Sequence, residues 1–147
     1  MTRRYYQGLK MIKQNLTLIF IIIISITISA CSQGPRPLEA VIKKNNLCVF
    51  TNNPKTYASF DNSVLVYLGK IDYTKEFKST YKKLYTKAPL PIEETNCVAI
   101  PLEVIDKNVP YEIVLETNKS FHARICVIDK GNRLEVKHIE AGKSACN

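Results

Sequence analysis

Short apolar runs, separated by residues that favour turns, recur along the chain from residue 39 onwards. Apolar and polar side chains alternate within several of these runs, as in a strand that has one face in a core and the other in solvent. The runs end at turn residues such as Asn52-Asn53-Pro54 and Lys130-Gly131-Asn132. The pattern predicts seven strands, at residues 39–43, 47–51, 63–71, 96–104, 111–117, 120–128 and 133–139.

Residues 72–95 fit two patterns. Phe77, Tyr81, Leu84 and Tyr85 recur at the spacing of a helix face, whereas the odd positions from 73 to 79 follow the alternation of a strand. No capping residues introduce a long apolar helix face there, so we expect an extended and partly irregular segment. The proline-rich stretch at residues 88–91 withholds backbone donors, which suits an edge or a crossing between sheets.

The predicted elements indicate an all-β fold. Seven short strands without a convincing helix favour an antiparallel, immunoglobulin-like β-sandwich. Residues 63–71 hold the longest β-branched and aromatic run, which suits a central strand. Residues 111–117 and 120–128 pair as a hairpin through Asn118-Lys119, and residues 133–139 form a half-exposed edge.

A charged opening and an apolar run precede the strands. Residues 16–28 carry no charge and follow an opening with four basic residues. This arrangement is typical of a signal peptide, and the run is shorter than the roughly 20 apolar residues of a membrane span. It ends in the sequence ISAC, at Cys31, which resembles the signal box of bacterial lipoproteins, whose cysteine is acylated and becomes the new N-terminus. The alternative is an uncleaved anchor with an incidental cysteine.

We therefore expect a lipoprotein signal peptide at residues 1–30, a lipidated tether at residues 31–38 and a β-sandwich domain at residues 39–147. Palmitate and the other acyl chains on Cys31 hold the domain at a membrane in the periplasm in this interpretation. Ser32 follows the acylated cysteine. In enterobacterial sorting a residue other than Asp at that place leads to the outer membrane, which is favoured here over the inner membrane.

Charge narrows the class of partner. Four of the 21 basic residues leave with the signal peptide and all 13 acidic residues stay, so the mature chain carries 17 − 13 = +4. The basic residues form no run of five or more and are not interleaved with aromatic residues as a base-stacking surface requires, which argues against nucleic-acid binding. A mildly basic face suits anionic lipid headgroups or an acidic partner; the alternative is an ordinary solvated surface.

Four cysteines remain for the mature domain after lipidation: Cys48, Cys97, Cys126 and Cys146. An even number in an oxidising compartment predicts two disulfides, with three possible pairings. We favour Cys48 with Cys97, because both lie in strand-like runs whose inward-facing side chains meet if the runs belong to opposite sheets. Cys126 with Cys146 then ties a strand to the C-terminal tail. The chain has no C-x-x-C or H-x-H motif, so we expect no metal site.

Candidate catalytic residues are sparse. His122 and His138 each lie alone in a predicted strand, without a carboxylate or cysteine at motif spacing. Glu93 and Glu94 are adjacent, so on an extended chain they point to opposite faces. A nucleophile made of Cys126 with His122 as its base is disfavoured by a compartment that oxidises thiols. The sequence predicts neither an enzyme nor a cofactor.

Tyrosines and lysines gather in the segment at residues 72–95. Tyr73, Tyr81 and Tyr85 stand there with Lys82, Lys83 and other lysines. Protein interfaces favour tyrosine and long cations on such connections, so these five residues are candidates for contact with a partner. The alternative is that the rings cover the core while the lysines remain solvated.

Several stretches carry a resemblance to a known family. They are ISAC at the signal box, VIKKNNLCVF, KAPLPIEETNCVAIPLEV and VPYEIVLETNKSFHARICVI, which together cover most of residues 39–128. The chain resembles the type VI secretion immunity periplasmic lipoproteins, a family of small bacterial lipoproteins. The resemblance implies that Cys48 and Cys97 pair, whereas Cys126 and Cys146 depart from the family pattern. It brings no catalytic residues. It implies a protein partner, a toxin effector delivered by type VI secretion; the alternative is a structural or assembly lipoprotein of the envelope.

Overall fold

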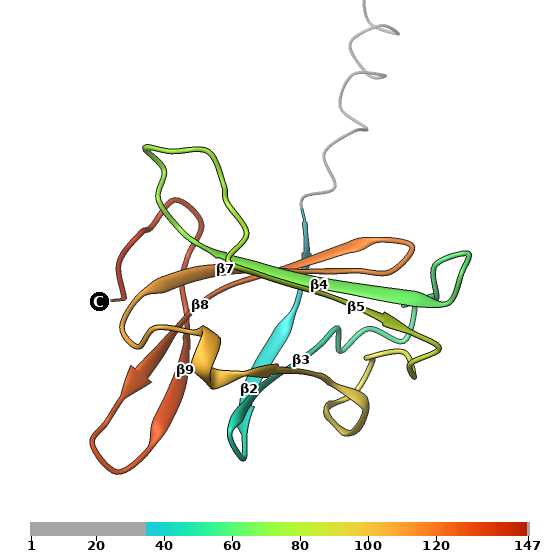
Figure 1. Ribbon diagram of the computed structural model, residues 1–147, viewed down its shortest axis with the longest axis horizontal. Coiled ribbons are helices and arrows are strands. Elements are labelled where there is room, and N and C mark those ends of the chain that lie inside the picture. The colour runs from blue at the N-terminus through green and yellow to red at the C-terminus, as the bar shows by residue number, and fades with distance from the viewer. Residues whose placement is uncertain (1–34, 147) are drawn as a thin grey trace, which may run out of the picture. The chain divides into compact units, whose positions relative to one another are not determined.

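The computed structural model describes residues 35–146, which form an all-β domain of nine strands and two 3-10 turns (Figure 1). The expected signal peptide and Cys31 lie outside the described residues. In the described part of the chain no helix is long and apolar enough to cross a membrane. The strands are β1 (Arg36–Pro37), β2 (Glu39–Lys43), β3 (Asn46–Phe50), β4 (Ser63–Lys70), β5 (Tyr81–Thr86), β6 (Val98–Pro101), β7 (Pro110–Glu116), β8 (Ser120–Asp129) and β9 (Leu134–His138).

The strands form a large sheet of six and a small sheet of three. In the large sheet the order is β1-β8-β7-β4-β5, and β9 also pairs with β8; the small sheet has the order β2-β3-β6. All pairs are antiparallel except β1 with β8, which is parallel. Strand β4 lies between β7 and β5, which confirms the central position predicted from its long β-branched run.

Both sheets contribute to one hydrophobic core. Alternate residues of β7 enter it, among them Ile113 and Leu115, and β3 adds Leu47 and Val49 from the small sheet. The residues between them point the other way, because successive side chains of a strand leave on opposite faces. A one-residue slip would move these buried side chains into water, so burial fixes the register. The large sheet therefore has a second face, turned away from the core.

The segment at residues 72–95 is largely extended, as predicted, and contains no α-helix. Its regular part is the strand β5, which is preceded by an irregular loop over residues 71–80. The proline-rich stretch carries the chain from the large sheet to the small one, since β5 and β6 belong to different sheets. A short 3-10 turn, η2 (Glu94–Asn96), leads into β6.

The prediction of a strand at residues 96–104 is wrong for its last three residues. Strand β6 stops at Pro101, and a 3-10 turn, η3 (Leu102–Val104), follows. Proline lacks the backbone donor that would extend the ladder, and here it precedes a turn whose Leu102 amide donates to the Asn45 carbonyl at 3.2 Å.

The predicted tether at residues 31–38 is also wrong at its end, because the compact unit begins at Pro35. Arg36 and Pro37 pair with β8, and Leu38 is 2 % exposed in the core. A proline is tolerated at the edge of a sheet, and burial of the leucine side chain stabilises this attachment by about 2 kcal/mol.

The disulfides join Cys48 to Cys97 and Cys126 to Cys146, which is the pairing that the sequence favours. The expectation that Cys48 and Cys97 link two sheets is wrong. Cys48 lies opposite Ala99 on the neighbouring strand β6, and Cys97 directly precedes that strand, so the bridge stays within the small sheet. Since Leu47 and Val49 face the core, Cys48 faces the opposite side, where η2 covers it. The bridge clamps two adjacent strands rather than two layers.

Candidate functional site

The face of the large sheet that points away from the core is called the outer face here. The strand registers place its side chains in rows across the sheet. One row runs from Lys82 on β5 through Tyr67 and Val114 to His122 on β8. Polar, aromatic and apolar side chains thus alternate on a surface built on rigid strands, and such a surface can hold its side chains in fixed positions for a partner.

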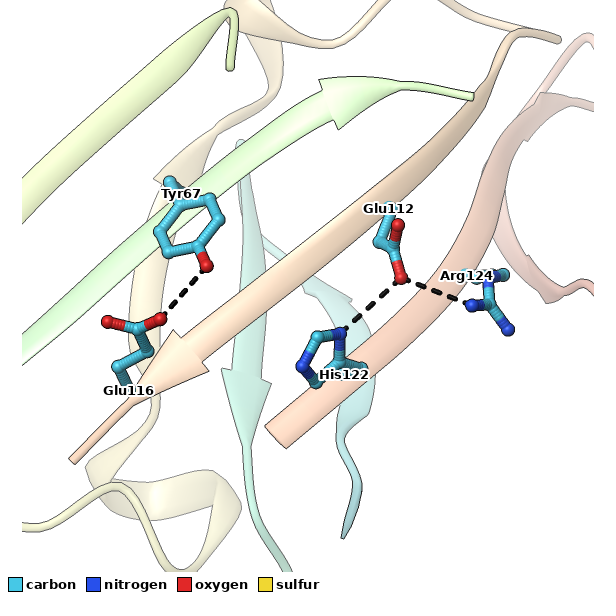
Figure 2. A network of polar contacts seen from close by, with 5 residues as sticks. All are labelled: Tyr67, Glu112, Glu116, His122 and Arg124. Atoms are coloured by element: carbon cyan, nitrogen blue, oxygen red, sulfur yellow. Dashed lines mark hydrogen bonds and ion pairs between the residues drawn. The ribbon is translucent and has the colours of Figure 1, made fainter. Parts of the chain in front are cut away.

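Glu112 contacts two side chains of the neighbouring strand, those of Arg124 and His122 (Figure 2). One of its carboxylate oxygens accepts a hydrogen bond from Arg124 Nη2 at 3.3 Å and lies 3.4 Å from His122 Nδ1. Arg124 is directly opposite Glu112 in the ladder and His122 is diagonal to it, so both positions are within reach of one carboxylate. The Nε of Arg124 is buried without a hydrogen-bond partner. The cluster fixes three polar side chains in the outer face.

Tyr67 forms a polar contact that is separate from the Glu112 cluster (Figure 2). Its hydroxyl donates a hydrogen bond to Glu116 Oε1 at 2.9 Å. Partial burial, with the hydrogen bond to Glu116 and the negative charges of Glu116 and Glu112, raises the pKa of Tyr67 to about 12. The ring also meets Phe77 edge-on, with centroids 6.2 Å apart. Tyr67 therefore remains a neutral hydrogen-bond donor at physiological pH.

We predict that the pH titration of the phenolic groups contains a component near pH 12 that disappears in Tyr67→Phe. Because the folded-state pKa is raised, the stabilisation is fully present below the ordinary value of 10.0 and is lost as the pH rises towards 12. Ultraviolet absorbance of the phenolate, compared between wild type and Tyr67→Phe, measures this component. An unchanged absorbance curve above the ordinary tyrosine range would contradict the contact with Glu116.

The loop at residues 71–80 folds against the outer face at the end of β4. A side chain at Gly69 would meet the backbone oxygen of Lys78 at 2.4 Å and the Phe77 ring at 2.8 Å, so only glycine allows this approach. Nearer the start of the loop, the Tyr73 hydroxyl donates to the Lys143 carbonyl at 3.4 Å. The C-terminal tail, held by the Cys126–Cys146 disulfide, thus lies beside the loop.

The structure brings four of the five predicted contact residues together on β5. Tyr81 and Tyr85 are half-buried and pack against the core, while Lys82 and Lys83 are exposed. The Tyr85 hydroxyl donates to the Ala99 carbonyl of β6 at 3.0 Å, and the Lys83 ammonium lies 4.8 Å from the Tyr85 ring centre. The two rings therefore close the edge between the sheets, and the lysines remain available.

Tyr73 is separate from that group. It lies beyond the far end of β4, in the loop at residues 71–80, and is 57 % exposed. The sequence analysis grouped Tyr73 with Tyr81 and Tyr85 because all three belong to one segment. In the structure Tyr73 lies in the loop that connects β4 to β5, whereas the other two lie on β5.

Positively charged side chains lie on the edge strand β5 and in the residues that flank it. We call Lys78, Lys82, Lys83 and Lys87 the basic edge; among the residues that the structure describes, none of the four forms an ion pair with an acidic side chain. Five lysines elsewhere in the described residues do form ion pairs, as Lys107 does with Asp129 at 2.7 Å. The basic edge is distinguished by the closeness of its four lysines along one strand and its flanks. Leu84 is 57 % exposed between these cations. The basic edge therefore combines uncompensated charge with exposed apolar surface.

The histidines differ from expectation in one respect. His138 is exposed on β9, but His122 has a carboxylate within reach, that of Glu112. The contact crosses the hairpin, so no local motif reveals it; the register of residues 111–117 against 120–128 is the signal that leads to it. Over residues 35–146 no group of three or more His, Cys, Asp or Glu side chains is placed to hold a metal ion.

Comparison with known proteins gives no relative: no family model, curated protein or solved structure matches this chain.

Proposed function

We propose that the protein is a lipid-anchored periplasmic binding protein that neutralises a toxin delivered by type VI secretion. In this proposal Cys31 carries the lipid and the domain works by covering the toxin, without chemistry of its own. The disulfides fit an oxidising compartment. The observation that carries the proposal is the basic edge, because it offers a protein partner both charge and apolar contact on one rigid strand.

We infer further that the fold belongs to the immunoglobulin-like class. The small sheet has the order β2-β3-β6, and the main part of the large sheet has the order β5-β4-β7-β8. If β2 is strand A of such a domain, the two sheets have the orders A-B-E and C′-C-F-G, which are immunoglobulin-like. The basic edge then lies at the C′ position, at the border of the sheet.

The partner that fits this edge is an acidic protein. Opposite charges raise the rate of encounter and exclude wrong partners, whereas the affinity comes from groups that lose water at the centre of the interface. Lys82 and Leu84 leave β5 on the outer face, and Lys83 leaves on the other side of the same strand. An acidic partner that packs along β5 can therefore contact cations on both sides of it.

Reversing the two central charges is expected to abolish protection. The test is growth of cells that export the product of the gene adjacent to this one, the candidate toxin, into their periplasm. Wild type restores growth, and Lys82→Glu/Lys83→Glu does not, because its affinity for the toxin falls by about 100-fold. Lys44→Glu/Lys130→Glu changes the net charge equally, at exposed positions in the β2–β3 and β8–β9 turns, away from β5, and should protect like wild type.

Equal protection by both double variants would contradict the claim that the basic edge contacts the toxin. Normal growth without this protein, or no protection by wild type, would overturn the toxin partner and favour a structural or assembly lipoprotein of the envelope.

A further inference from the structure

The turn that precedes β4 is held by a compact set of hydrogen bonds. The Asn62 amide donates to the Ser59 carbonyl at 3.0 Å, which closes the turn. The Asp61 carboxylate accepts from the Ser63 hydroxyl at 2.6 Å and from the Ser59 hydroxyl at 2.7 Å. The same hydrogen bonds lower the pKa of Asp61, so the carboxylate remains charged. Four polar residues thus fix the backbone on both sides of Phe60.

Phe60 stands at the corner of this turn with its whole side chain in solvent. Its relative exposure is 108 %, and Tyr57 on the same loop is 59 % exposed. Single exposed apolar residues are common on protein surfaces. Phe60 differs because a fixed turn presents the entire ring, which contributes nothing to the core. A rigid, fully exposed aromatic ring loses little conformational entropy when a partner buries it.

The turn is continuous with the basic edge. Ser63 pairs with Thr86 at the end of the β4–β5 ladder, and the Lys87 amide donates to the Asn62 carbonyl at 3.2 Å. The Phe60 turn therefore lies at the same end of the large sheet as Lys87, the last lysine of the basic edge. Figure 1 shows β4 and β5 side by side. One partner surface can reach both features.

The neighbouring charge distinguishes two classes of partner. The Asp61 carboxylate is next to Phe60 in the chain. Insertion of that loop into the apolar interior of a bilayer would take the charged group out of water, which is costly. An apolar pocket in a protein can receive the ring while the carboxylate stays at its rim.

We propose that Phe60 is the apolar anchor of the interface: the Ser59–Asn62 turn inserts it into a hydrophobic pocket of an acidic protein partner that also contacts the basic edge. This inference rests on the proposed function and adds to it the residue that supplies most of the affinity. Charge brings the partner to β5, and the buried ring then slows dissociation.

The test is the dissociation constant of the complex with the purified product of the adjacent gene, measured for wild type and Phe60→Ala. We expect the constant to rise at least about 30-fold, mainly through faster dissociation, with the melting temperature unchanged. Tyr73→Ala is the matched control: this ring is also exposed, but β4 separates it from Phe60 by about 25 Å. Its constant should stay within about threefold of the wild-type value.

Each other result overturns the inference in a different way. Unchanged binding by Phe60→Ala removes Phe60 while leaving the proposed function intact, whereas no binding by wild type overturns both. Wild type and Phe60→Ala are also mixed with vesicles of phosphatidylethanolamine and phosphatidylglycerol. Phe60-dependent binding to those vesicles would assign the ring to a bilayer instead. A wild-type dimer in solution that Phe60→Ala converts to a monomer would assign it to a second copy of this chain.

Discussion

Replacing both cysteines of the Cys48–Cys97 bridge with alanine is expected to lower the free energy of unfolding by about 4 kcal/mol. The bridge closes a loop with a sequence separation of 49, and without it the unfolded chain regains the freedom that this loop removes. For a domain of this size the loss corresponds to a fall of roughly 15 °C in melting temperature. Thermal unfolding followed by circular dichroism measures it.

The second disulfide provides the comparison for that experiment. Cys126 and Cys146 are separated by 20, so replacing both should cost about 3 kcal/mol, somewhat less than the first bridge. The tail that follows β9 is released, whereas the small sheet keeps its clamp. If oxidised and reduced wild-type samples melt at the same temperature, the structural role assigned to both bridges is contradicted.

Phe121→Ala is expected to destabilise the domain by about 3–5 kcal/mol. Phe121 is 0 % exposed, and it pairs with Leu115 of β7 on one side and with Arg36 of β1 on the other. Truncation removes apolar contact and leaves a cavity beneath three strands. Denaturant unfolding gives the change in free energy.

Leu84→Ala is the control for that variant. Leu84 is 57 % exposed on β5, so its truncation should change the free energy of unfolding by no more than about 0.5 kcal/mol. Equal effects of the two substitutions would show that the core has been assigned to the wrong face of the large sheet.

The hairpin of β7 and β8 shows how much structure can be predicted from the alternation of apolar and polar residues. The sequence predicts both strands and their connection, and the structure pairs Glu116 with Ser120. Only this register places Tyr111, Ile113 and Leu115 together in the core, so the local pattern is sufficient. Strand β5 is not among the seven predicted strands: its tyrosines fit a helix face as well as a strand, so the sequence predicts only an extended, partly irregular segment there.

Contacts between distant strands were harder to derive. The run around Cys48 is continuously apolar, so the alternation that turns Cys48 away from Leu47 and Val49 is hidden in it. The pairing of Cys48 with Cys97 is therefore predicted correctly, whereas the side of the sheet on which Cys48 lies is not. The attachment of Arg36 and Pro37 was missed for a similar reason, since two residues next to a glycine and a proline carry no strand pattern.

The candidate interface also contains residues whose exposure the sequence predicts and residues whose exposure it does not. The exposure of Lys82 follows from alternation with the half-buried Tyr81. That of Lys83 does not, because Lys83 shares the face of Tyr81 and Tyr85; it is exposed at the edge of the sheet. Phe60 has no periodic partner in the sequence, and its exposure depends on how the loop before β4 is held. The only local signal is its place among Ser59, Asp61 and Asn62, residues that favour turns and hold this one.

The basic edge and Phe60 have separate parts in the proposed interaction. Salt screens exposed charges, so added salt should weaken the contribution of Lys82 and Lys83 and leave that of the buried ring nearly unchanged. The Glu112 cluster lies on β7 and β8, on the other half of the large sheet, where Glu112 forms an ion pair with Arg124. We therefore place the interface at the β4–β5 end.

The most direct test of the central claim is a calorimetric titration of the disulfide-intact domain, residues 32–147, with the purified product of the adjacent gene. Binding to a toxin predicts a complex of one copy of each protein, with a dissociation constant below about 100 nM at physiological ionic strength. If both proteins are folded and no saturable binding is observed, the claim that this domain neutralises that toxin is contradicted.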